Sequence, residues 1–405
     1  MKYMKNAIKS DRTPSETNYA PFKITGITQC KNEWGLVALS IGYALVNHVD
    51  EVYVLNDSST DETHAGLAYL QDIWPGRIHI YNQTEGQFIE EGQINALVGL
   101  AQQSEPDWIY FFDADEFLIS RNGSSLKDCL GSLPANCHAL RYALKNFILP
   151  RNFNEQSLSD YLSIEYEAMV DPSVPKESLR KYEEIYKGNL NFFHMPFPSK
   201  VIFRNQGWMH LAAGSHDVAY NKDVETLRTD QFYAAHLSWI SLERLRRKAD
   251  LGKTHIVNGY SKKHGWQNQL IYRIAEEDRL EELWERHSLP EPGEPRGCAP
   301  TNVKRNRDFQ SAIKTTVQIL VRSGFNPQNL CQFKTEPIPA APAPPTDFRF
   351  QTLVALMDRQ KAAVRSRPSR RKKTNPTMRF FRRLRKSIAK RLPPYVPGSL
   401  KKAKS

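Results

Sequence analysis

The first third of the chain alternates apolar segments of strand length with segments of helical periodicity. The strand-like segments cover 22–28, 51–55, 77–81 and 108–112, and the helix-like segments between them cover 36–46, 59–72 and 88–103. Parallel neighbours in a sheet need a crossover connection, which a helix supplies, and such crossovers are right-handed. The alternation therefore predicts an α/β domain with a Rossmann-like, mainly parallel sheet flanked by helices.

Two of these strands end in acidic residues. The apolar run from Trp108 to Phe112 stops at Asp113 and Asp115, and the second strand is followed by Asp57. Burying an unpaired carboxylate is costly, so such strand ends usually lie at an open edge of the sheet. In α/β sheets the carboxyl ends of the strands are also where ligands bind. We expect Asp113 and Asp115 to face solvent together, near Asp57.

Carboxylates in this position suit a divalent cation. Oxygen ligands are typical of Mg²⁺ and Mn²⁺ sites, and either ion can bridge the oxygens of a diphosphate. The alternatives are that Asp113 and Asp115 cap a turn and that Asp57 interacts with the dipole of the following helix. The pattern favours a metal–nucleotide site at this edge of the sheet.

Four motifs in the same region resemble those of family-2 glycosyltransferases. They are, in chain order, Gln29-Cys30-Lys31-Asn32-Glu33, Asn56-Asp57-Ser58-Ser59-Thr60-Asp61, Gly92-Gln93-Ile94-Asn95-Ala96 and Asp113-Ala114-Asp115-Glu116-Phe117. Each lies at the end of a predicted strand or within a predicted helix, and the resemblance covers about residues 22–120. The Asp-x-Asp-Glu-Phe form resembles a divergent branch close to the family-92 type.

The resemblance implies a GT-A fold, in which a nucleotide-sugar donor lies over the carboxyl ends of the first strands. It implies that Asp57 contacts the base, with a UDP-sugar favoured, that Asp113 approaches the ribose and the metal, and that Asp115 holds Mn²⁺ or Mg²⁺ on the diphosphate. The residues implied to line the donor pocket are Asn32, Glu33 and Asn95. Family-2 enzymes invert the sugar by a single displacement, so we expect inverting, metal-dependent transfer to a hydroxyl acceptor.

The acceptor side is less marked in the sequence, although an acceptor hydroxyl needs a general base within hydrogen-bond reach. Lys200 followed by Gly214-Ser215-His216-Asp217 resembles an element of the divergent branch. This makes His216 a candidate ligand of metal or phosphate, and Asp217 a candidate base. Glu116 is a second catalytic candidate, with three open roles: water-mediated metal binding, contact with the acceptor, or plain solvation. His236 is a further candidate, with packing as its alternative role.

The chain divides into four parts by composition. They are a GT-A-like domain at 20–240, with a nucleotide-sugar half at about 20–120 and an acceptor half at about 121–240, a helical extension at 241–333, a Pro/Ala-rich linker at 334–347 and a disordered basic tail at 348–405. Within the extension, helices are predicted at 241–251 and 266–287. Aromatic residues such as Phe192 and Trp239 are expected to pack in the core rather than against sugar rings.

The C-terminal tail carries the excess of positive charge. Residues 359–405 contain 18 Lys and Arg and no Asp or Glu, which leaves 38 basic against 44 acidic residues in the rest of the chain. Residues 378–392 place apolar side chains on one helical stripe with basic residues around it. Such a helix suits an anionic membrane surface. A solvated tail and nucleic-acid binding are the alternatives, and nucleic acid is the less favoured partner.

The sequence also indicates a location and two competing functions. It has no signal-peptide pattern before Asp11 and no membrane span, and its five cysteines are widely spaced without a Cys-x-x-Cys motif. We expect a cytoplasmic protein, peripheral on the inner face of the cell membrane, acting on an envelope polysaccharide, a lipid-linked saccharide or another glycoconjugate. The alternatives are a nucleic-acid- or membrane-binding protein that acts through its tail, and a metal-dependent phosphatase. The phosphatase is less favoured because its Asp-x-Asp motif usually follows the first strand, with Thr or Val at the position of Phe117.

Overall fold

The computed structural model of the protein describes residues 22–83, 90–220, 224–257, 259, 265–291 and 300–333. The predicted linker at 334–347, the basic tail at 348–405 and its amphipathic helix at 378–392 lie outside the described residues. Within the described ranges, no helix has both the length and the apolar character needed to cross a bilayer.

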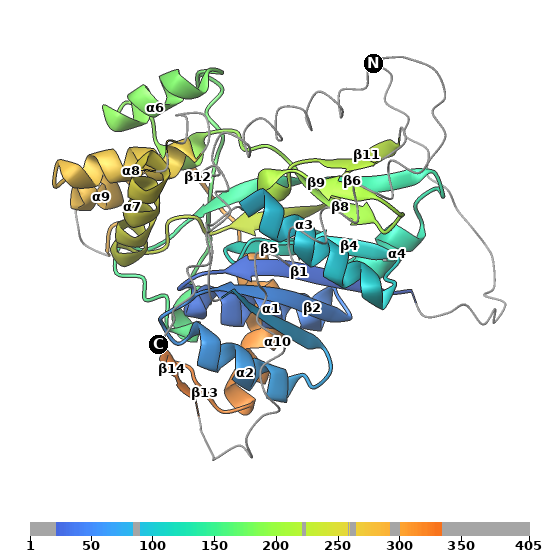
Figure 1. Cartoon of the computed structure of the whole chain (residues 1–405). Coiled ribbons are helices and arrows are strands. Elements are labelled where there is room, and N and C mark those ends of the chain that lie inside the picture. Colours follow the sequence, from blue (N-terminus) through green and yellow to red (C-terminus); the bar gives the residue numbers. More distant parts are fainter. Residues whose placement is uncertain are drawn as a thin grey trace, which may run out of the picture.

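The first part of the fold is a parallel sheet with helices on both faces (Figure 1). Its strands are β1 (Ile24–Cys30), β2 (Glu51–Asp57), β3 (Ile78–Gln83) and β4 (Trp108–Phe111), and its helices are α1 (Trp34–Asn47), α2 (Thr63–Ile73) and α3 (Glu90–Ala101). The strand order is β4-β1-β2-β3, and the neighbours in this order pair in parallel. The α/β fold class predicted from the sequence is confirmed.

Alternation along each strand decides which helices cover which face. Val52 and Val54 of β2 pack in one core with residues of α1 and α2, whereas Tyr53 and Leu55 pack in a second core with residues of α3. A parallel strand that is covered on both faces has a nearly continuous apolar sequence. The polar residues that follow β1, β2 and β4 therefore gather at the carboxyl edge of the sheet.

A mixed set of strands extends this sheet beyond β4. β8 (Lys200–Arg204) is antiparallel to both β4 and β6 (Cys137–Ile148), and the sheet continues through β7 (Tyr166–Ala168) to β12 (Val303–Arg305). β11 (Glu225–His236) runs parallel to β6 and antiparallel to β5 (Glu116–Ser120).

Short elements connect these strands. They are α4 (Leu126–Gly131), α5 (Leu158–Tyr161), α6 (Ser178–Tyr186), the antiparallel pair β9 (Met209–Leu211) and β10 (Val218–Tyr220), and the 3-10 turns η1 (Gln102–Ser104), η2 (Phe192–His194) and η3 (Ala213–Ser215).

Helices α7 (Leu242–Val257), α8 (Trp266–Glu276) and α9 (Leu280–His287) form a third core together with α6 and η2. Trp239 stacks on Phe192 in this core with the ring centroids 4.2 Å apart, so both aromatic side chains pack inside as expected. The helix predicted over 266–287 is divided into α8 and α9, because Asp278 between them has a left-handed φ of 56°.

Helix α10 (Asp308–Arg322) packs instead against α1, on the side of the parallel strands that α1 and α2 cover (Figure 1). The hairpin of β13 (Phe325–Asn326) and β14 (Asn329–Phe333) follows it. The indole nitrogen of Trp34 donates to the carbonyl oxygen of Leu330 at 2.9 Å. The predicted extension at 241–333 thus contributes to two separate cores.

Candidate functional site

The acidic motif forms the turn between β4 and β5. The backbone N–H of Glu116 donates to the carbonyl oxygen of Asp113 at 3.0 Å and closes this turn. The side chain of Asp113 is 34% exposed, whereas Asp115 and Glu116 are buried. His236 of β11 and Arg244 of α7 each lie 3.8 Å from a carboxylate oxygen of Asp115. The expectation that Asp113 and Asp115 face solvent together is therefore wrong for Asp115, because β11 and α7 cover it.

A buried lysine lies between two acids of the turn. Nζ of Lys200, on β8, donates to Oδ2 of Asp113 at 2.6 Å and lies 2.8 Å from Oε1 of Glu116. Burial lowers the pKa of Lys200, but the attraction of Asp113 and Glu116 raises the pKa by more, so the ammonium is charged at neutral pH. Within the described residues, the other carboxylate oxygen of Glu116 is buried and accepts no hydrogen bond. Glu116 is thus not a solvated side chain, which excludes one of its three expected roles.

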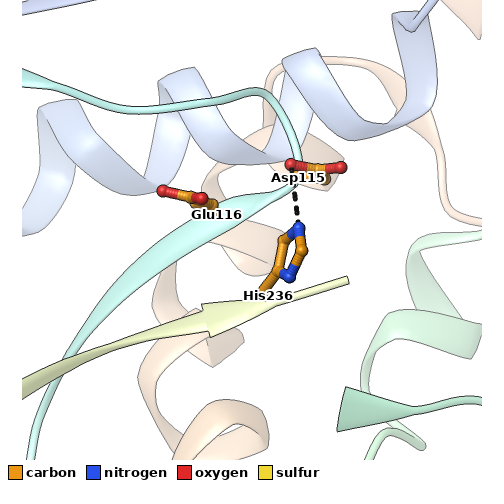
Figure 2. Close-up of side chains that lie close together, drawn as sticks. All are labelled: Asp115, Glu116 and His236. Atoms are coloured by element: carbon orange, nitrogen blue, oxygen red, sulfur yellow. Dashed lines mark ion pairs between the residues drawn. The ribbon is translucent and has the colours of Figure 1, made fainter. Parts of the chain in front are cut away.

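His236 lies opposite Glu116 across the β5–β11 ladder, and its ring points toward the acids (Figure 2). The amide nitrogen of Asn146, on β6, donates to the carbonyl oxygen of Phe193 at 3.0 Å, so the amide oxygen of Asn146 faces Nδ1 of His236 at 2.8 Å. This acceptor favours the tautomer with its proton on Nδ1, which leaves the lone pair of Nε2 toward Asp115. Burial lowers the pKa of His236 to about 4, so the ring is neutral at pH 7.

The residues at this place fit a divalent cation. Asp115, Glu116 and His236 each offer one ligand atom, and these atoms lie within 4.8 Å of one another. Two carboxylate oxygens and a neutral imidazole nitrogen form a donor set that suits Mn²⁺. The hydrogen bond between His236 and Asn146 is the outer contact that metal-binding histidines usually make. The unpaired oxygen of Glu116 adds capacity to bind a cation.

This trio differs from the metal ligands expected from the sequence, which were Asp113, Asp115 and His216. Asp113 pairs with Lys200 instead. His216 follows η3, where Gly214 has a left-handed φ of 69° and a Cβ would contact the His216 ring. Burial and then the charge of Lys200 lower the pKa of His216 to about 4. His216 therefore lies beside the Lys200–Asp113 pair, outside the trio whose ligand atoms converge.

Asp217, the candidate general base, lies on the accessible side of this region. Its side chain is 68% exposed and its carboxylate pairs with Arg141 of β6. One of its oxygens also accepts from the backbone N–H of Val218 at 3.0 Å. The carboxylate is thus oriented and accessible, as a base that accepts a proton from an incoming hydroxyl must be.

The loops after β1 and β2 hold each other in place. Asp57 is buried at the end of β2, with Oδ2 at 3.6 Å from Nζ of Lys31, and this oxygen accepts no hydrogen bond within the described residues. The side-chain oxygen of Asn32 accepts from the backbone N–H of Thr60 at 2.7 Å. The backbone N–H of Asn32 donates to Oγ of Ser59 at 2.9 Å. Asn32 therefore connects the two loops that flank Asp57.

The helices that follow these two loops begin without a side-chain hydrogen bond from their N-cap residues, which are Glu33 for α1 and Glu62 for α2. The backbone N–H groups of Glu33 and Trp34 donate instead to Thr63 and Asp61 of the second loop, at 3.3 and 3.4 Å. The backbone N–H of Thr63 donates to Asp61 at 3.0 Å.

Asn95 of α3 is buried and holds β9 to the helix. Its amide nitrogen donates to the carbonyl oxygen of Leu211 at 2.8 Å, and its amide oxygen accepts from the backbone N–H of Leu211 at 2.9 Å. Both ends of the amide thus bind the backbone of Leu211, and a role of Asn95 in lining a donor pocket stays a prediction.

Helix α7 brings two basic side chains to the acids. Arg244 is 3% exposed and pairs with Glu33, at the N-terminus of α1. Burial raises the pKa of Glu33, and Arg244 opposes that rise. Lys248 lies one turn further along α7 and interacts electrostatically with Arg244, Asp115 and Glu33. Burial lowers the pKa of Lys248.

Several of these residues carry no sufficient signal in the sequence. Arg244 and Lys248 belong to a basic run at the start of a predicted helix, and spacing alone does not show that this helix covers the acidic turn. Asn146 of β6 lies in a segment without any motif. His236 is a candidate from the sequence, but its place opposite Glu116 depends on the pairing of β5 with β11.

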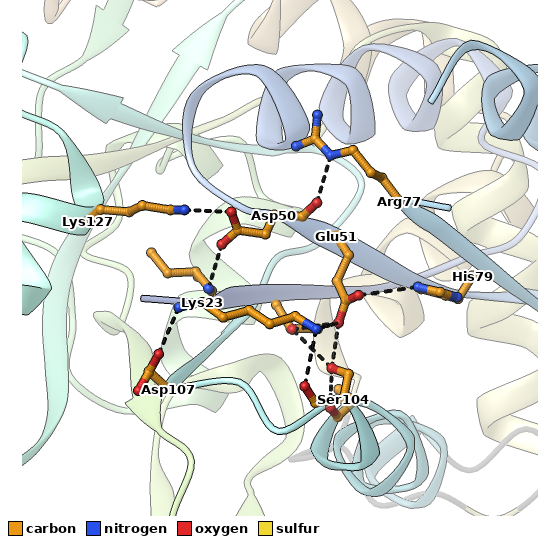
Figure 3. A network of polar contacts seen from close by, with 11 residues as sticks. Lys23, Asp50, Glu51, Arg77, His79, Ser104, Asp107 and Lys127 are labelled. Atoms are coloured by element: carbon orange, nitrogen blue, oxygen red, sulfur yellow. Dashed lines mark hydrogen bonds and ion pairs between the residues drawn. The ribbon is translucent and has the colours of Figure 1, made fainter. Parts of the chain in front are cut away.

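A second polar cluster lies at the opposite, amino-terminal edge of the parallel strands (Figure 3). Glu51 accepts from Oγ of Ser104 at 2.5 Å, and it lies 3.1 Å from Nζ of Lys23 and 3.4 Å from Nε2 of His79. Burial raises the pKa of Glu51, but hydrogen bonds from His79, Ser104 and Lys23 outweigh burial and lower the pKa to about 2. These groups interact with one another, and we interpret the cluster as one that stabilises the sheet rather than as a ligand site.

Comparison with known families supports one interpretation of the carboxyl edge. The family model described as Glycosyl transferase family 2 matches residues 27–121. The match includes the loop of Asp57 and the whole acidic turn, and it ends before Lys200 and His236. It supports a glycosyltransferase for this part of the chain. No curated protein matches the chain.

Solved structures similar to the chain are distant ones. Residues 1–349 of TarS from S. aureus are 14% identical with a TM-score of 0.31, over 64% of this chain and 73% of that chain. The mannosyltransferase PcManGT from Pyrobaculum calidifontis, in complex with GDP-Man and Mn²⁺, is 13% identical with a TM-score of 0.32, over 76% of this chain and 79% of that chain. Glucosyl-3-phosphoglycerate synthase from Mycobacterium tuberculosis, in complex with Mg²⁺ and UDP, is 17% identical with a TM-score of 0.22, over 30% and 43%. Similarity of this degree defines neither the site nor the activity of the chain.

Proposed function

We propose that the protein is a glycosyltransferase that moves a sugar from a nucleotide-sugar donor to a hydroxyl acceptor, by an inverting displacement that depends on Mn²⁺ or Mg²⁺. One observation carries the proposal: the family-2 match at 27–121 contains the strand ends where Asp57 and the acidic turn lie. A UDP-sugar is the favoured donor, and a saccharide or a lipid-linked saccharide is the favoured acceptor.

Asp115, Glu116 and His236 are the residues that would hold the cation. When bound there, the cation supplies a Lewis acid for the diphosphate oxygens that gain negative charge as the sugar leaves. Asn146 keeps Nε2 of His236 available, and Lys200 fixes Glu116 through its other oxygen. These contacts come from the protein's own side chains and orient the donor set, and such preorganisation is the usual source of electrostatic catalysis.

The remaining candidates divide between donor and acceptor. We assign the base contact to Asp57, whose Oδ2 accepts no hydrogen bond within the described residues, and the ribose contact to Asp113, which is the accessible acid of the turn. Asp217 is the proposed general base for the acceptor hydroxyl. Glu116 is buried against Lys200, which supports metal binding rather than contact with the acceptor.

The test compares Asp115→Asn with Asp250→Asn, which changes an exposed acid on α7 in the same way. UDP-, GDP- and dTDP-sugars are offered with Mn²⁺ or with a chelator, and release of the nucleoside diphosphate is measured. We expect metal-dependent release by the wild type, at least about a hundredfold loss for Asp115→Asn because it removes a metal ligand, and no change for the control. Thermal unfolding of both variants checks that the fold is intact. Full, metal-responsive activity of Asp115→Asn would remove the assignment.

A further inference from the structure

The charges at the carboxyl edge do not balance without α7. Four carboxylates gather there, those of Glu33, Asp113, Asp115 and Glu116, and Lys200 on β8 is the cation that the sheet itself supplies. With all four carboxylates counted as ionised, the formal net charge of the cluster with Lys200 alone is −3, and a divalent cation would bring it only to −1. A cluster that remains negative repels a diphosphate, even with its metal in place.

The two basic residues of α7 change the sign of this sum. Arg244 and Lys248 are four residues apart and therefore share one face of the helix. Together they bring the cluster to −1 alone and to +1 with a divalent cation. A site with a charge of −1 attracts a divalent cation, and the charge of +1 that results attracts a diphosphate. The metal would therefore bind before the diphosphate.

The hydrogen-bonding capacity of the pair points in the same direction. Arg244 is 3% exposed, its terminal nitrogen faces Glu33 and Asp115, and its Nε is buried without an acceptor within the described residues. The ammonium of Lys248 makes no ion pair and no hydrogen bond with the described part of the chain. Buried polar groups such as Nε of Arg244 normally have partners, and the side chain of Lys248 is half-buried. The unused donors of the pair thus lie where an anion with several oxygens would supply acceptors.

We propose that Arg244 and Lys248 of α7 bind the diphosphate of the donor, as a protein cation that acts beside the metal. The proposal rests on the proposed function and extends it to a helix that the family model does not cover. Arg244 is the residue that orients the diphosphate, because Glu33 and Asp115 hold its guanidinium in place. Lys248 is the residue that contacts phosphate oxygens, because a flexible ammonium donates to them without a fixed geometry.

The experiment uses Lys248→Met, which keeps the length and packing of the side chain and removes its charge. Lys253→Met is the matched control, since Lys253 is an exposed lysine of the same helix. Lys248→Arg tests whether charge alone restores binding. The probes are inorganic pyrophosphate with Mn²⁺, UDP and GDP with Mn²⁺, the nucleosides uridine and guanosine, and Mn²⁺ alone, each measured by calorimetry on the full chain.

We expect Lys248→Met to bind pyrophosphate and the nucleoside diphosphates about ten- to a hundredfold more weakly, the range for loss of a charge-assisted hydrogen bond. The same variant should bind Mn²⁺ alone at least as tightly as the wild type, because a neighbouring positive charge has been removed. A purely structural role would weaken both. Nucleoside binding and the Lys253→Met control should be unchanged, and Lys248→Arg should recover most of the affinity.

Unchanged pyrophosphate affinity in Lys248→Met would overturn this inference and leave the proposed function intact. Equal weakening of Mn²⁺ and pyrophosphate binding would also overturn it, since the lysine would then only stabilise the acidic cluster. A wild-type protein that binds neither pyrophosphate nor any nucleoside diphosphate would overturn this inference and the proposed function together.

Discussion

Lys200→Met tests the electrostatic arrangement of the acidic turn. The side chain of Lys200 is 3% exposed and its ammonium lies 2.6 Å from Asp113 and 2.8 Å from Glu116. Breaking a buried ion pair by removing one partner costs about 3–5 kcal/mol, because the other charge remains buried. Asp113 is 34% exposed and can regain water, whereas the Glu116 side chain is 2% exposed and cannot. Most of the cost therefore falls on Glu116.

The cost should depend on pH with a definite sign. Burial raises the pKa of Glu116 well above its usual value, and Lys200 opposes that rise. Without Lys200 the folded-state pKa of Glu116 rises further, so over a wider pH range the folded state holds a proton that the unfolded state has released. Stability of the variant then falls as pH rises from about 4.5, the unfolded value, through the raised folded value. We expect a loss of about 3–5 kcal/mol at pH 8, or roughly 6–10 °C in Tm, and a clearly smaller loss at pH 5.

The measurement is urea unfolding of wild type, Lys200→Met, Glu116→Gln and the double variant at pH 5 and pH 8, with a chelator to remove divalent cations. Lys314→Met, an exposed lysine on α10, is the control. The double variant should recover at least about 2 kcal/mol of the loss, because the two residues are coupled. A loss under about 1 kcal/mol at pH 8, or additive effects of the two substitutions, would refute the reasoning.

Two further predictions concern stability away from the site. Burial lowers the pKa of His48 to about 4 and that of His287 to about 3, so just below about pH 6.5 each histidine takes up a proton only in the unfolded state. Thermal unfolding should show stability falling by about 1 kcal/mol per histidine for each pH unit below that point. A Tm that is flat from pH 6.5 to 4.5 would contradict this prediction. Gly35→Ala places a Cβ against the backbone carbonyl of Glu155 and should lower the free energy of urea unfolding by about 1–3 kcal/mol. The control Gly131→Ala has open space at its Cβ and should not lower it. Equal stability of the two alanine variants would contradict the prediction for Gly35.

The parallel strands and the acidic turn could be predicted from the sequence, because both depend on local patterns. Strands β2 and β4 contain continuous apolar runs, and Asp113 and Asp115 follow the run of β4. The metal trio could not be predicted in the same way. His236 reaches Glu116 only through antiparallel pairing over more than a hundred residues of sequence, and no periodicity records that pairing.

The same limit explains the burial of Asp115. The prediction of an exposed acid assumed that nothing lies over the strand ends, which holds for a sheet with two layers of helices. Here α7 returns from the third core to place Arg244 against that edge. The helical pattern of α7 was recognisable, but its packing partner depends on tertiary contacts that single-sequence patterns do not contain.

The contact between Trp34 and Leu330 has a consequence for how the chain matures. A ribosome releases Trp34 early, yet the acceptor for its indole N–H is synthesised 296 residues later. The hydrophobic core beneath the first strands thus stays incomplete until the β13–β14 hairpin has been synthesised. A fragment limited to residues 27–121 would expose the apolar surface that this hairpin covers. Contacts of such long sequence separation slow folding. The chain is consequently expected to need its last described hairpin before the donor half becomes stable, so shortened versions for biochemistry should end after Phe333 rather than before α10.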